Sequence, residues 1–164
     1  MNITALLMAL ENLGLAKGIR DSLYAFPVIE GTHVIALTLV FGTIAIVDLR
    51  LLGVASRDRA VGRVIREVLP YTWGAFGVAA LTGSLLFCSN AMTYGHNFFF
   101  RGKLVLLVLA GLNMSVFHLF VGRDIARWSA APRPPLSART TGAVSLGLWI
   151  SVVAFGRWIG FTLH

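Results

Sequence analysis

Charged residues and cysteine are both scarce in this chain. Only 13% of its 164 residues are charged, whereas 57% are hydrophobic, and the mean hydropathy is +0.79. This balance excludes a disordered chain and lies far outside the composition of soluble domains. A single cysteine, Cys88, excludes an intramolecular disulfide framework. The sequence also lacks a glycine-rich phosphate loop and a recognisable nucleophile arrangement, so it does not decide whether the protein is an enzyme.

Acidic residues are few as well, with 7 Asp and Glu against 14 Lys and Arg. The resulting net charge of +7 would suit nucleic acid, but membrane proteins become basic through their cytoplasmic loops. Nine of the basic residues lie in segments 50–66 and 123–139, and five lie near the other ends of the apolar segments. We therefore expect a lipid bilayer and no nucleic acid as partner. The asymmetry predicts that both termini lie outside, which in a Gram-negative cell means an inner-membrane protein with its termini in the periplasm.

Four segments are apolar and long enough to cross a bilayer, since a span needs about 20 apolar residues. They cover residues 23–47, 70–91, 103–121 and 141–163. Proline is tolerated in the first turn of a helix, so Pro27 fits the start of the first span and Pro70 is expected to open the second. The sequence predicts an all-α integral membrane four-helix bundle, with residues 23–163 as one transmembrane domain.

Residues 1–22 are too polar to span a membrane. Ile3, Leu6, Leu7 and Leu10 follow the i, i+3, i+4, i+7 spacing of one helix face. This pattern predicts a short amphipathic helix in the membrane interface. A cleaved signal peptide is the rival interpretation, but no basic residue precedes the apolar run and no clean small-x-small site follows it. We expect the segment to remain in the mature protein.

Ionisable residues interrupt the first apolar span. Glu30 and His33 lie about 60° apart on a helix, and Asp48 returns to the same side. Such groups are costly in hydrocarbon, so they normally face the bundle interior and mark a functional site. The alternative is that they only hydrogen-bond neighbouring helices.

Histidines in two spans suggest haem, because neutral imidazole is a common axial ligand. At about 1.5 Å per residue, His33 lies near the middle of the membrane, at the level of about Asn113. His118 lies roughly 8 Å from the inner edge. The two histidines therefore differ in height by about 10–20 Å and are not expected to ligate one iron. One or two b-type haems are predicted instead, with His33 as one ligand and His118 as a possible second.

The same prediction gives supporting roles to other polar residues. Glu30 and Asn113 would hydrogen-bond around the haem site, and Lys103 and Arg157 would contact propionates or lipid headgroups. A buried ion pair between Glu30 and Arg157 is a further possibility. Snorkelling of Arg157 to lipid phosphate is the alternative.

Copper is the second candidate cofactor. Cys88, Met92 and His96 are spaced i, i+4, i+8, so a continuous helix would place them on one face. Thiolate, thioether and imidazole ligands select Cu(I). Gly95 is expected to end that helix, and such residues are also ordinary packing residues. A third hypothesis is a cofactor-free structural subunit of a larger membrane complex. The sequence leaves a homo-oligomer open.

Several stretches carry a family resemblance. They are FPVIEGTHVIALTLVFGTIAIVDLRLLG, LPYTWGAFGVAALTGSLLF, FFRGKLVLLVLAGLNMSVFH and GRWIG. Over nearly its whole length the chain resembles a family of small bacterial four-span membrane proteins without an assigned function. More distantly, its layout is similar to copper-resistance protein D domains and to the HemJ-type protoporphyrinogen oxidase. Those share a histidine in an early span and a lysine opening a later one, here His33 and Lys103.

The two distant resemblances imply different functions. The HemJ type implies b-type haem and redox chemistry on a porphyrin, and the copper-resistance type implies metal passage or delivery. The chain lacks the tryptophan-glycine stretch and the aromatic-proline end of the HemJ histidine span. It also lacks methionine- and histidine-rich outer loops. The leading hypothesis is a b-type haem protein that passes electrons within the membrane, with a quinone or a redox protein as partner.

Overall fold

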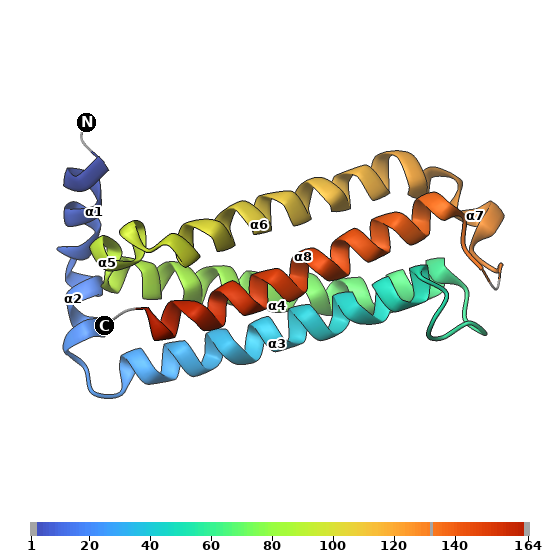
Figure 1. Cartoon of the computed structure of the whole chain (residues 1–164). Helices are drawn as coiled ribbons and strands as arrows, with labels where there is room; N and C mark the ends of the chain where they lie inside the picture. Colours follow the sequence, from blue (N-terminus) through green and yellow to red (C-terminus); the bar gives the residue numbers. More distant parts are fainter. Residues whose placement is uncertain (1–2, 132, 163–164) are drawn as a thin grey trace.

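The protein is an elongated bundle of four long helices (Figure 1). The computed structural model describes residues 3–131 and 133–162, and within them the chain is helical without strands. The long helices are α3 (Ala25–Leu51), α4 (Val61–Ser89), α6 with its continuation (Phe98–Trp128) and α8 (Leu136–Phe161). Each is long and apolar enough to cross a membrane. The predicted all-α bundle with a multi-pass membrane architecture is confirmed.

The second long helix begins earlier than predicted. α4 starts at Val61, so Pro70 lies inside the helix and does not open it, and that prediction is wrong. An interior proline typically costs about 3 kcal/mol. Val61 and Val64 are fully buried, and Val61 packs with Leu51 in a core cluster at this end of the bundle. Burying two such side chains contributes about 3–6 kcal/mol, which outweighs the proline and extends the helix.

The N-terminal segment forms two short helices, α1 (Ile3–Glu11) and α2 (Gly14–Asp21). Both run across one end of the bundle, roughly at right angles to the long helices (Figure 1). They contact α4, α5 (Ala91–His96) and α3. The predicted short amphipathic helix is thus present, although it is divided in two, and its crosswise direction fits a position in the membrane interface.

A break at Asn90 separates α4 from α5 and leaves backbone groups of both helices without helical partners. The N-terminal helices supply those partners. Glu11 Oε2 accepts a hydrogen bond from the N–H of Met92 at 3.1 Å, and Arg20 Nη1 donates to the carbonyl of Ser89 at 3.0 Å. Residues far apart in the sequence therefore close this α1–α2 end of the bundle.

At the opposite end, near α7 (Ile125–Trp128), one arginine holds the two loops together. Arg50 is 0% exposed. Its Nε donates to the carbonyl of Arg59 at 2.7 Å, and its Nη2 donates to the carbonyl of Ala131 at 3.2 Å. Charge-assisted hydrogen bonds of this kind are about twice as strong as neutral ones. Arg50 thus fixes this α7 end, which frames the larger cavity described below.

The four long helices do not pack evenly. α4 packs along α3, α6 packs along α8, and α3 joins the two pairs through α8. A Cβ atom at Gly142 of α8 would lie 2.9 Å from Cβ of Leu51, so the glycine permits this close approach. α4 and α6 have little contact with each other. The bundle is therefore loosest between α4 and α6.

Candidate functional site

His33 is held in one orientation by α4. Its Nδ1 lies 3.0 Å from Oγ1 of Thr82, and that hydroxyl lies 2.7 Å from the carbonyl oxygen of Val78. A hydroxyl has one hydrogen, and the carbonyl can only accept it. We therefore assign the hydrogen of the first contact to Nδ1 of the imidazole. Nε2 then keeps its lone pair and is the atom available to a ligand.

Gly83 brings the α4 backbone against the imidazole ring. A Cβ atom at this position would lie 2.9 Å from Cε1 of His33 and 3.4 Å from its Nδ1. Real Cβ atoms essentially never come within 3.0 Å of another heavy atom. Only glycine leaves room for the ring here, so Thr82 and Gly83 together fix the position of His33.

Lys103 brings a positive charge to the same place. It lies in the second turn of α6, is half-buried, and is close enough to His33 for its charge to act on the imidazole. Its side chain packs against α8, where a Cβ atom at Gly156 would lie 3.6 Å from Nζ. Among the residues described, none forms an ion pair with its ammonium group. A lone ammonium group inside a membrane bundle is costly and marks a functional position.

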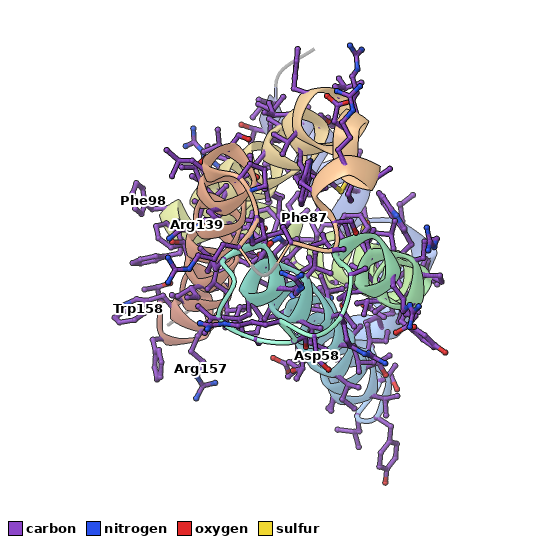
Figure 2. All side chains as sticks on the ribbon, turned by 90° about the vertical axis from the view of Figure 1, so that its right-hand side faces the viewer. Asp58, Phe87, Phe98, Arg139, Arg157 and Trp158 are labelled. Carbon is purple, nitrogen blue, oxygen red and sulfur yellow. The ribbon has the colours of Figure 1, made fainter. Side chains whose placement is uncertain are left out.

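The predicted ion pair between Glu30 and Arg157 does not form. Both side chains are exposed, and no partner within 4.0 Å joins them among the described residues. Arg157 points outward from α8 (Figure 2), with its guanidinium carbon 5.1 Å from the ring centre of Phe161. Its position fits the snorkelling alternative. Glu30 instead acts on Tyr94 of α5, whose pKa is raised by burial and further by this carboxylate.

Asn113 lies far from His33, so the prediction that it shares the depth of that histidine is wrong. Its Nδ2 donates to the carbonyl of Thr141 at 3.1 Å, near the α7 end. α6 begins at Phe98, five residues before the predicted start at Lys103, which shifts every depth estimate on this helix. Lys103 is the α6 residue whose charge acts on His33, and Asn113 belongs to a second polar site.

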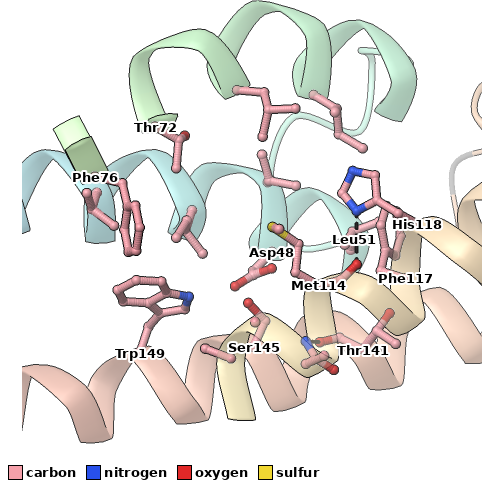
Figure 3. Close-up of a pocket in the computed structure, with 18 of the residues that line it drawn as sticks. Asp48, Leu51, Thr72, Phe76, Met114, Phe117, His118, Thr141, Ser145 and Trp149 are labelled. Atoms are coloured by element: carbon pink, nitrogen blue, oxygen red, sulfur yellow. Dashed lines mark hydrogen bonds between the residues drawn. The ribbon is translucent and has the colours of Figure 1, made fainter. Parts of the chain in front are cut away.

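The second polar site is a cavity of about 210 Å³ among all four long helices, toward the α7 end (Figure 3). Its walls are mostly aliphatic and aromatic. Its polar lining includes Asp48, Asn113, His118, Thr141 and Ser145. The cavity thus combines an apolar interior with a few polar groups, which is the usual character of a small-molecule site.

Asp48 is the most buried ionisable group of this cavity. The residue is 4% exposed, and its Oδ2 has no hydrogen-bond partner among the described residues. Ser145 of α8 faces the carboxyl group (Figure 3). Buried polar atoms are nearly always hydrogen-bonded, so an unpartnered one requires an explanation. The sequence placed Asp48 at the inner end of its span, and packing against α8 encloses it.

His118 lines the same cavity from η1 (Phe117–Val121), a π-helical turn that follows α6. Its Nδ1 lies 2.9 Å from the carbonyl of Met114 and must donate to it, so Nε2 keeps its lone pair. Lys103 marks the level of His33 on this helix, and His118 lies 15 residues further along the chain. That spacing corresponds to about 20 Å along a helix. The two histidines therefore serve separate sites, as the depth argument predicts. π-helical turns often occur at functional sites.

The spacing argument for copper does not hold in the structure. Cys88 lies near the end of α4, whereas Met92 and His96 lie on α5, after the break at Asn90. The continuous helix that would align the three side chains is absent. Nδ1 of His96 donates to the carbonyl of Met92 at 2.8 Å. Across residues 3–131 and 133–162, no three His, Cys, Asp or Glu side chains gather as a metal site.

The fold and its two interior polar sites define a four-span α-helical membrane protein. The chain belongs to the family described as a family of unknown function (DUF6644), which matches residues 11–162. This confirms the expected membership of an uncharacterised family. No curated protein and no solved structure matches the chain. The comparisons thus show no similarity to copper-resistance protein D or to the HemJ type.

Sequence reasoning found both histidines, Lys103 and Asp48, but it missed the residues that hold them. Thr82 and Ser145 are ordinary hydroxyl residues in apolar helices, and nothing in their local sequence distinguishes them from other serines and threonines. The only available signal was Gly83, which follows Thr82 in a helix interior, where glycine is unfavourable unless a close approach requires it.

Proposed function

We propose that this protein binds one b-type haem at His33 and passes electrons within the membrane. The observation that carries the proposal is a fixed imidazole with a free Nε2 beside an unpaired lysine. His33, Thr82 with Gly83, and Lys103 come from three different long helices. Imidazole is a common axial ligand of haem iron, and bundles build cofactor sites from inward-facing side chains of facing helices.

The residues present suit the chemistry of that group. Thr82 accepts the Nδ1 hydrogen of His33, which is the outer-shell contact that orients a ligating histidine. Lys103 offers a positive charge to a propionate carboxylate. When bound, haem supplies one-electron chemistry, and these side chains position it.

The proposal assigns one haem and leaves His118 out of it. The cavity at His118 measures about 210 Å³, below the roughly 300–1,000 Å³ of ordinary ligand pockets. A second haem would need the surrounding helices to separate. The proposal retains the inner membrane as the location, with the arginine-rich α7 end inside and both termini outside, because of the positive-inside rule.

The test is an absorption spectrum of gently purified protein, oxidised and dithionite-reduced, with metal analysis of the same sample. A Soret band with sharp reduced α and β bands is expected at about one haem per chain. The variant His33→Ala should lose most of this haem. His96→Ala, which removes an exposed histidine of α5, is the matched control and should retain it.

Each other outcome supports a different hypothesis. Haem that persists in His33→Ala would overturn the assignment of the ligand. A colourless sample with stoichiometric copper that disappears in Cys88→Ser would favour copper handling. Protein without cofactor, co-purifying with a partner in mild detergent, would favour the structural subunit.

A further inference from the structure

We infer that the cavity at the α7 end binds a quinol, a lipid-soluble diphenol, whose two hydroxyl groups donate to Asp48 and His118. The inference does not depend on the haem proposal, because no residue of the His33 site lines this cavity. It rests on two unpartnered hydrogen-bond acceptors that face one apolar space.

The first acceptor is Asp48. Its Oδ2 is buried without a partner, and the residue is 96% removed from the surface. Ser145 faces the carboxyl group, but it leaves this oxygen unsatisfied. Leaving a buried polar atom unpaired is unfavourable. A ligand hydroxyl that donates to Oδ2 would remove this cost.

The second acceptor is Nε2 of His118. Because Nδ1 donates to the carbonyl of Met114, the neutral ring can only accept at its other nitrogen. Ser115 and Thr141, the nearby hydroxyl residues, already donate to backbone carbonyls of their own helices. The positions that Asp48 and His118 leave without a partner are therefore acceptors, which suits a hydroxyl-bearing ligand.

The rest of the cavity suits a flat ring with an apolar tail. Phe76, Trp149 and Trp73 line it, and aromatic side chains bind planar rings through their faces and edges. Aliphatic residues of α3 and α6 complete the walls. A volume of about 210 Å³ holds a headgroup. The tail would then extend toward lipid between α4 and α6, the neighbouring long helices that pack least closely.

Two other occupants explain less. A lipid acyl chain would fill the apolar part but leave Asp48 and His118 without partners. A metal ion would need more ligands than the described residues gather, since no cluster of three His, Cys, Asp or Glu side chains is present in them. A diphenol satisfies both acceptors with one molecule.

The experiment measures binding of decylubiquinol to the full-length protein in lipid nanodiscs under anaerobic conditions. Trp73 and Trp149 report binding through their fluorescence. The matched probe is the dimethyl ether of the same quinol, which keeps the ring and the tail but has no hydroxyl donors. The quinol should bind roughly a hundredfold more tightly than the ether, because the ether loses two hydrogen bonds of roughly tenfold each.

Two variants remove one acceptor each at similar size, Asp48→Leu and His118→Phe. Each should weaken quinol binding roughly tenfold and leave binding of the ether unchanged, which also shows that the cavity is intact. Asp124→Leu and His96→Phe change exposed residues outside the cavity and should bind the quinol as the unaltered protein does. Equal binding of quinol and ether would overturn the inference, as would full quinol affinity in both cavity variants.

Discussion

His33, which is half-buried, and His118, which is exposed on one side of its cavity, have the same tautomer in different surroundings. Both use Nδ1 as a donor and keep Nε2 free. His33 has the ammonium group of Lys103 nearby, whereas His118 shares its cavity with the carboxyl group of Asp48. The first site therefore suits an anionic or metal-containing group, and the second suits a hydroxyl donor. The sign of the neighbouring charge decides the chemistry, because the imidazole is the same in both.

The two sites also differ in how tightly the helices enclose the ring. At His33 the α4 backbone touches the imidazole at Gly83. At the second site Gly111 of α6 lines the cavity, and a Cβ atom there would meet nothing within 4 Å. The first site thus holds its imidazole ring closely against α4, whereas the second leaves an internal cavity beside its histidine.

The largest expected effects are losses of one ligand without loss of the other. His33→Ala should remove haem and leave quinol affinity within about twofold, since the two sites lie about 20 Å apart and distant changes are nearly additive. Asp48→Leu should do the reverse. The measurements are haem content by absorption and quinol affinity by fluorescence on the same preparations. If either variant loses both ligands while remaining folded, the two sites are one, and the comparison fails.

The next largest effect is a difference in stability between alanine substitutions at Gly83 and at Gly111. Gly83→Ala forces the His33 ring away from α4, so we expect a loss of about 1–3 kcal/mol in the free energy of unfolding and a lower haem content. Gly111→Ala meets open space and should be neutral or stabilising by up to about 1 kcal/mol, since alanine favours helix. Unfolding in mixed micelles measures both. Equal effects at the two positions would show that Gly83 does not hold the His33 ring as described.

How much could be predicted from the sequence depends on the kind of feature. Span number and helical class follow from the length and composition of the apolar segments, and the structure agrees. The separation of His33 from His118 follows from helical rise alone. The neighbours could not be predicted, because they depend on rotation and offset between helices. α6 begins five residues earlier than predicted, and that shift together with the offset between the helices places Lys103, ten residues before Asn113, near His33. The pairing of Glu30 with Arg157 failed for the same reason, since equal depth does not place two residues on facing sides.

The smallest expected effect is a change in the pKa of Tyr94 when the carboxylate of Glu30 is removed. It tests whether that carboxylate acts on Tyr94 and so leaves Lys103 as the charge near His33. Burial raises the pKa of Tyr94, and Glu30 raises it further, so this phenol should keep its proton above the ordinary value of about 10. The folded protein then holds a proton that the unfolded chain releases. Stability from this group is therefore full below about pH 10 and falls as the pH rises toward the folded-state pKa.

An ultraviolet titration of tyrosine ionisation measures this pKa, with Tyr94→Phe identifying the relevant step among the three tyrosines. Glu30→Gln should move that step part of the way back toward pH 10, because it removes the carboxylate and leaves the burial. Glu67→Gln, which changes an exposed carboxylate at the far end of α4, should not move it. A shift in Glu30→Gln would place the carboxylate at Tyr94 and leave Lys103 as the charge that distinguishes His33 from His118. No shift would contradict the action of Glu30 on Tyr94, and the assignment of a net positive charge to the His33 site would lose this support.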